Sequence, residues 1–212
     1  MVFGKRKSQI ELSMLTRFAM VFFIMSLAAI MLMFSSTEQK GLCKTQAQIT
    51  ASQIASSINQ VLVSPAEDER KVIPLESALS IGQRDRARYT VKITERPATS
   101  TLTIGVESAE KDCTAYQSVG FDRSVILNFQ GQAVLGEEFS NDPESLTTLV
   151  LSPTAPTGDR SRFLIVLKCN EKSFGGQKYL YLQDCTQDDP GSCLNFNFDV
   201  PDDELTQNCG FS

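Results

Sequence analysis

The most prominent hydrophobic feature of the chain is an uninterrupted apolar run near its N-terminus. Residues 18–37 are twenty consecutive uncharged residues, FAMVFFIMSLAAIMLMFSST. As a helix with a rise of about 1.5 Å per residue, this run spans roughly 30 Å, the thickness of a bilayer hydrocarbon core. Nine of its residues are Phe, Val, Ile or Leu, and these favour membrane insertion by about 3–5 kcal/mol in total. The pattern therefore predicts a transmembrane helix over residues 18–37.

Residues 38–63 keep a helical pattern in which only one face is apolar. The apolar positions recur every three or four residues: Cys43, Ala47, Ala51, Ile54, Ile58 and Val61. We expect an extracytoplasmic amphipathic helix over residues 38–63 that continues the transmembrane one, with Gly41 as a site for a kink. Because the residue before a proline is pushed out of the helical region, Pro65 predicts that the helix ends at Val63. The whole helix is expected to begin near Glu11.

After Pro65, alternation with period two replaces the helical spacing. Residues 89–94 and 102–106 alternate in this way, and residues 95–100 between them have the composition of a hairpin connection. Further strand candidates, separated by clusters of Gly, Asn, Asp and Pro, are residues 124–129, 148–151, 162–169, 178–183 and 194–198. The charged run 67–71 predicts a solvated turn. We therefore expect an α+β protein whose residues 64–212 form an antiparallel β-sheet or sandwich, with a subdivision near 152–158.

The charges that flank the apolar run predict its orientation. Basic residues are in excess before the run (Lys5, Arg6, Lys7 and Arg17), whereas Lys40, Lys44 and Glu38 follow it. By the positive-inside rule, residues 1–17 stay in the cytoplasm and the rest of the chain is extracytoplasmic, as in a single-pass protein of the cell membrane. The alternative is a cleaved secretory signal peptide, although the run exceeds the usual apolar length and no A-x-A-like site closes it.

All six cysteines follow the apolar run, on its predicted extracytoplasmic side: Cys43, Cys113, Cys169, Cys185, Cys193 and Cys209. An even number of cysteines in an oxidising compartment predicts disulfides. The sequence has no C-x-x-C motif, so the cysteine spacing does not indicate redox chemistry or a zinc ribbon. Sequence alone does not select among the connectivities. Our guess is Cys185–Cys193 across a short loop rich in Asp, Pro and Gly, then Cys169–Cys209, and Cys43–Cys113 tying the helix to the sheet. Free buried thiols are the alternative.

The segment before the apolar run has an unusual order of residue types. Basic residues, a small residue, Gln and an acidic residue follow one another as Lys5, Arg6, Lys7, Ser8, Gln9, Ile10 and Glu11. This order resembles the class III signal peptide of archaeal type IV pilin-like proteins, and the resemblance covers roughly residues 5–63. Two departures are that Ser8 replaces the usual Gly or Ala, and that Glu11 would be the third mature residue where the family most often has an acid at the fifth.

The resemblance implies processing and assembly. A prepilin-type peptidase would recognise Lys7, Ser8 and Gln9 and cut between Ser8 and Gln9, which leaves the apolar helix on the mature protein. In such proteins the acidic residue pairs with the N-terminal amine of a neighbouring subunit inside an apolar bundle, and here that residue is Glu11. The implied partners are the lipid bilayer, the peptidase, and copies of this chain or other pilin-like subunits. The generic alternative is a plain single-pass anchor whose Lys5–Lys7 only set topology.

The composition and net charge of the chain exclude several kinds of catalytic, metal and nucleic-acid site. The chain has no His, which removes Ser-His-Asp and Cys-His catalysis and every His-containing zinc site. A net charge of −5 argues against a nucleic-acid partner. Seven acidic residues and no basic residue follow Tyr179, and calcium prefers carboxylate oxygens as ligands. The spacing of these acids matches no calcium-binding loop, so a solvated acidic face is the simpler interpretation.

The function that these patterns predict is structural. We expect a membrane-anchored, pilin-like surface protein, a structural or assembly subunit whose extracytoplasmic β-domain is not an enzyme and needs no metal or cofactor. The alternative is a single-pass tethered binding or adhesion module that does not polymerise.

Overall fold

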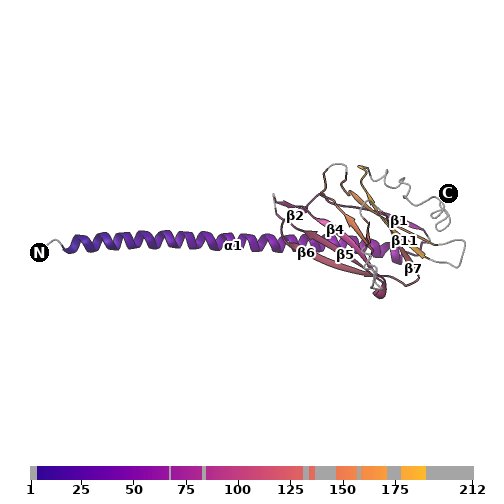
Figure 1. Cartoon of the computed structure of the whole chain (residues 1–212), viewed down its shortest axis with the longest axis horizontal. Coiled ribbons are helices and arrows are strands. Elements are labelled where there is room, and N and C mark those ends of the chain that lie inside the picture. The colour runs from indigo at the N-terminus through magenta and orange to yellow at the C-terminus, as the bar shows by residue number, and fades with distance from the viewer. Residues whose placement is uncertain are drawn as a thin grey trace. The chain divides into compact units, whose positions relative to one another are not determined.

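The protein is described from a computed structural model. The structure describes residues 4–66, 68–82, 85–130, 134–136, 147–156, 159–170 and 178–189. The chain divides into two compact units, residues 1–41 and residues 42–212. One helix, α1 (Gly4–Val63), contains residues of both units (Figure 1).

Helix α1 is longer at its N-terminus than the sequence pattern predicts. It begins at Gly4 rather than near Glu11, and it ends at Val63, as Pro65 predicts. At this end the backbone N–H of Ser64 donates to the Gln60 carbonyl at 3.1 Å, which closes the last turn. Gly41, the predicted kink site, lies within α1 and is the last residue of the first unit.

Among the residues that the structure describes, the second unit contains three β-sheets in addition to residues 42–63, the outer part of α1. The four-stranded sheet has the order β1 (Glu69–Pro74), β10 (Phe163–Asn170), β11 (Lys178–Cys185) and β7 (Val125–Gln130). The five-stranded sheet has the order β6 (Cys113–Gly120), β5 (Thr101–Ser108), β4 (Thr90–Arg96), β9 (Thr147–Leu151) and β8 (Val134–Gly136). A short pair joins β2 (Leu79–Ser80) to β3 (Arg86–Ala87), and the 3-10 helix η1 (Pro97–Thr99) connects β4 to β5.

The α+β prediction is confirmed, and so is the hairpin of residues 89–106, because β4 and β5 pair antiparallel. Strands β7, β9, β10 and β11 overlap four of the five other predicted strands, whereas residues 194–198 lie outside the described residues. One pair departs from the predicted antiparallel arrangement, because β7 runs parallel to β11. The predicted subdivision near 152–158 falls between β9 and β10, which belong to different sheets of one compact unit.

The charged run 67–71 is not wholly a turn, because β1 begins at Glu69 and includes Arg70 and Lys71. The position of β1 at the edge of its sheet explains why this strand carries charged residues. Among the described strands, β1 lies at an edge of its sheet and pairs with β10 alone, and charged side chains at an edge discourage pairing with other chains. Strand β6 was also missed, since its inward positions include Ala115 and Gln117, which give a weak apolar alternation.

The apolar face of the outer part of α1 forms the centre of the core, as its periodicity predicts. Six side chains of this face are at most 2% exposed: Cys43, Ala47, Ala51, Ile54, Ile58 and Val61. They belong to one cluster that includes Val106 and Ile104 of the five-stranded sheet and Val166 and Leu180 of the four-stranded sheet. At the borders of this face, α1 contacts an edge strand of each sheet, through Gln48 with Gln117 on β6 and Gln60 with Lys71 on β1.

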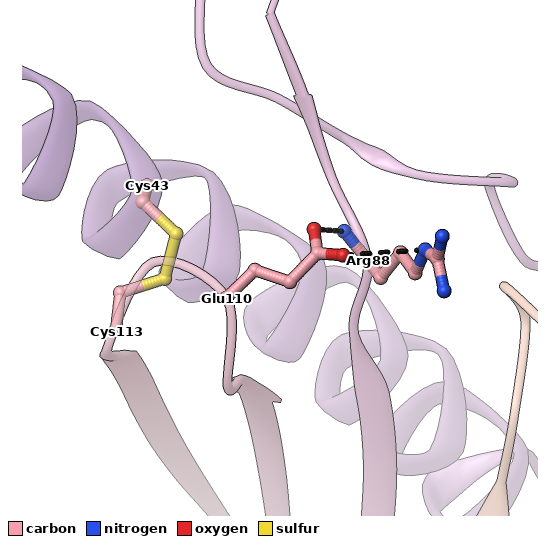
Figure 2. The surroundings of a disulfide bond; sticks show 4 residues. All are labelled: Cys43, Arg88, Glu110 and Cys113. Atoms are coloured by element: carbon pink, nitrogen blue, oxygen red, sulfur yellow. Dashed lines mark hydrogen bonds and ion pairs between the residues drawn. A yellow bond between two sulfur atoms is a disulfide. The ribbon is translucent and has the colours of Figure 1, made fainter.

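A disulfide between Cys43 and Cys113 joins α1 to the start of β6, as predicted (Figure 2). The two Cα atoms are 6.0 Å apart, a usual separation for a bridged pair. The turn before Cys113 is held by Glu110, whose carboxylate accepts from the backbone N–H of Arg88 and pairs with its Nε, each at 3.2 Å (Figure 2). In that turn Asp112 has a φ of 49°, a conformation that Asp tolerates better than most residues. The cystine is therefore set between a buried helix face and a restrained turn.

We predict that Cys43→Ser lowers the free energy of unfolding of the full chain in detergent by about 4 kcal/mol, because the bridge closes a loop over a sequence separation of 70. Urea unfolding measures this. Thiol titration of the unreduced, unfolded variant should find one free thiol, that of Cys113. The control is Lys44→Ser at the neighbouring exposed position, which should change stability by less than about 0.5 kcal/mol. Equal stability of the Cys43→Ser variant and the native chain would contradict the role of the bridge.

Candidate functional site

The first unit presents an apolar helical surface with no covering side chains. Between Met14 and Phe34, fifteen large apolar side chains of α1 are each between 42% and 74% exposed. Soluble proteins rarely expose a contiguous apolar patch larger than a few hundred Å². This stretch is long and apolar enough to cross a membrane, and none of it is buried within the chain. It is therefore a candidate membrane-spanning segment.

The hydroxyl of Thr37, the last residue of the apolar run, is satisfied within the helix itself. The Thr37 hydroxyl donates to the Met33 carbonyl at 2.9 Å, one turn earlier. Such internal bonding is what a helix needs where water is absent. The run can therefore end on a hydroxyl residue without an unsatisfied donor.

The residues that the family resemblance singles out are all helical in the structure. Lys7, Ser8, Gln9 and Glu11 lie in the first turns of α1, and their side chains are outside what the structure describes. These four residues therefore lie on one helix. The structure describes no contact of their side chains that would test the predicted cleavage or subunit pairing.

A buried lysine that the sequence pattern did not reveal closes the other end of α1. Lys168 on β10 is only 6% exposed and lies on the same strand face as the core residues Leu164 and Val166. Its ammonium donates to the carbonyls of Ser64 at 2.6 Å and Leu62 at 3.5 Å. A cation at a helix C-terminus interacts favourably with the dipole and satisfies carbonyls that the helix leaves free. The alternation of apolar and polar residues along a strand does not show that a charged residue such as Lys168 will face inward.

Two more cysteines lie on the opposite face of the four-stranded sheet. Cys169 and Cys185 are buried there with Ile165, Leu167 and Tyr181, and both are disulfide-bonded. The strand register places Cys169 opposite Tyr179 and Cys185 opposite Phe163, at the two ends of the β10–β11 ladder, so they cannot bond to each other. The predicted pairs Cys185–Cys193 and Cys169–Cys209 include residues outside the described part of the chain, and they stay predictions.

The acids that suggested calcium are engaged with protein groups where the structure describes them. The Ser161 hydroxyl donates to Asp184 at 3.0 Å and accepts from the backbone N–H of Ser152 at 2.8 Å, which links β11 to the end of β9. Asp188 forms an ion pair with Arg162. Among the described residues, no group of three or more His, Cys, Asp or Glu is arranged to hold a metal ion.

The solvent face of the five-stranded sheet carries a polar network around one aromatic side chain. Tyr116 on β6 is 59% exposed, and its ring lies against Gly105 on β5, where a Cβ would come within 2.9 Å of the ring. The Tyr116 hydroxyl donates to Glu107 at 3.2 Å, and Glu107 also pairs with Lys92 at 2.7 Å. Cross-strand pairs of this kind stabilise a sheet, so the network has a structural explanation.

Comparison of the chain with known protein families, with characterised proteins and with solved structures finds no match. Its function must therefore be inferred from its own residues.

We predict a pH dependence from Asp184. Burial raises the pKa of this carboxyl, and the hydrogen bonds from Ser161 and from the Cys185 backbone lower it in part. The folded chain therefore holds this proton more tightly than the unfolded chain. The associated stability is present below the ordinary Asp pKa, about 3.9, and is lost as the pH rises through the raised value.

Asp184→Asn removes this titration. Melting curves of the full chain at a series of pH values should show the variant gaining stability relative to the native chain across that window, and a constant difference above it. Asp188→Asn, whose carboxylate is an exposed ion-pair partner, is the matched control. Parallel pH profiles for native chain and Asp184→Asn variant would show that this carboxyl does not titrate as described.

Proposed function

We propose that this protein is a membrane-anchored, pilin-like surface subunit whose extracytoplasmic β-domain is structural rather than catalytic. One observation carries the proposal: a single helix, α1, has an exposed apolar stretch of bilayer length followed by a stripe that forms the core of a disulfide-bonded β-domain. Long helices of this kind, apolar first and amphipathic afterwards, are what the resemblance to archaeal type IV pilin-like proteins implies.

The position of the disulfides supports the proposed orientation. Disulfides persist in oxidising compartments, and Cys43 follows the end of the apolar run by only six residues. With residues 1–17 in the cytoplasm, the whole second unit lies outside it. The basic residues before the run favour the same orientation.

A non-catalytic role rests on composition and on the disposition of polar groups. The sequence contains no His. Two of the described acids serve structural purposes, since Glu110 restrains the turn before the cystine and Asp184 links two strands. We accordingly assign the β-domain to surface presentation and assembly.

Processing is the first test of this proposal. Protein extracted from membranes should have a mature N-terminus at Gln9, and intact mass should equal that of residues 9–212 with all cysteines oxidised. Ser8→Asp should block cleavage by placing a charge at the residue before the cut, whereas the control Ser13→Asp, beyond the recognition residues, should be processed. A native chain that begins at Met1 would remove the pilin assignment, and one that begins after residue 35 would remove the anchor.

Assembly is the second test. Glu11→Gln keeps the size of the side chain and removes its charge, so it should leave membrane insertion intact and abolish filaments, because a carboxylate in an apolar bundle needs a charged partner. Electron microscopy of surface preparations and membrane fractionation measure the two properties. Glu38→Gln, after the apolar run, is the matched control and should assemble normally.

Two outcomes of this experiment distinguish the alternatives. Undiminished filaments from the Glu11→Gln chain would contradict the role of Glu11. Membrane-inserted native protein that forms no filament under any condition would favour the second function, a tethered binding or adhesion module that does not polymerise.

A further inference from the structure

A small cavity lies at the C-terminal end of α1, within the second unit. Its volume is about 190 Å³. One wall is apolar and is formed by Leu62, Val63, Phe121 and Val125. At about 30 Å³ per water molecule, the cavity has room for a ligand of roughly six non-hydrogen atoms.

The polar side chains that line this cavity are Asn59, one carboxylate and two ammonium groups, so its charged groups are mostly cationic. The ammonium groups come from Lys168, which is buried, and Lys178, which is exposed. Asp122 contributes one carboxylate, whose charge is stabilised by the backbone N–H of Ser124 at 2.9 Å. Two cations and one anion give the lining a net charge of +1, which complements a ligand with a single negative charge.

Lys168 is held in a fixed position but retains donor capacity. An ammonium has three N–H groups, and two of them are accounted for by the carbonyls of Leu62 and Ser64. One N–H therefore remains for a further acceptor, and Lys168 lines the cavity. A charge-assisted hydrogen bond from a buried, restrained ammonium is stronger than one from a mobile surface lysine.

We propose that this cavity binds a carboxylate carried on a short aliphatic chain. The carboxylate accepts from Lys168 and Lys178, and the aliphatic chain contacts Leu62, Val63 and Val125. A phosphate dianion fits less well, because it would place two negative charges beside an apolar wall and a lining whose net charge is only +1. The carboxylate can belong to a free short-chain acid or to an acidic side chain of a second copy of this chain.

The test is a titration of the full chain in lipid nanodiscs with butyrate, followed by NMR of labelled Leu and Val methyl groups. Butyrate has six non-hydrogen atoms and one negative charge. We expect saturable shifts at Leu62, Val63 and Val125. Butanol and butylamine, which share the aliphatic chain without the carboxylate, should not produce them.

Lys178→Gln should weaken the apparent butyrate affinity about tenfold, since it removes one charge-assisted hydrogen bond at an exposed position that the fold does not depend on. Lys44→Gln, an exposed lysine on α1 outside the cavity, is the matched control and should bind as the native chain does. Absence of saturable shifts, equal binding by the Lys178→Gln variant, or tighter binding of inorganic phosphate than of butyrate would overturn the proposal.

The same spectra distinguish the two sources of the carboxylate. Shifts at the cavity methyl groups that appear only with added butyrate assign the site to a free acid. Shifts that appear with rising protein concentration, and that butyrate reverses, assign it to a carboxylate of a second copy.

Discussion

The burial of one face of α1 is the constraint on which the second unit depends. Ala47 and Ala51 have almost no side chain, so strands can approach the helix closely, while Ile54 and Ile58 fill the space further along. Both larger sheets contribute to this one cluster, and α1 reaches an edge strand of each. Without residues 43–61 this cluster would lose the helix face against which both larger sheets pack.

The two parts of α1 differ in whether the core of the β-domain depends on them. The core needs the helix only from Cys43 onward, and none of the exposed side chains between Met14 and Phe34 contributes to it. Folding of the β-domain therefore does not explain why the apolar run exists. Its length and exposure make it a candidate membrane-spanning segment, for which a bilayer or a bundle of like helices would supply the apolar environment.

Sequence patterns were sufficient where one periodicity dominated. The spacing from Cys43 to Val61 identified the buried helix face, Pro65 identified its end, and alternation identified the hairpin of β4 and β5. The patterns failed where tertiary context decides. The charged edge strand β1, the parallel pairing of β7 with β11 and the inward position of Lys168 all depend on neighbours distant in sequence.

Lys168 illustrates why such a residue escapes prediction yet matters to the fold. The last turn of a helix leaves carbonyl groups without partners within the helix, and the usual solutions are a glycine cap or water. Here α1 ends at Val63, and neither Gly nor Asn follows it. Instead Lys168, on a strand more than a hundred residues later, donates to the carbonyls of Leu62 and Ser64. At the other end of the buried helix face, Cys43 is bonded to Cys113. The outer part of α1 is thus fixed to the five-stranded sheet by a covalent bond and to the four-stranded sheet by a charged side chain.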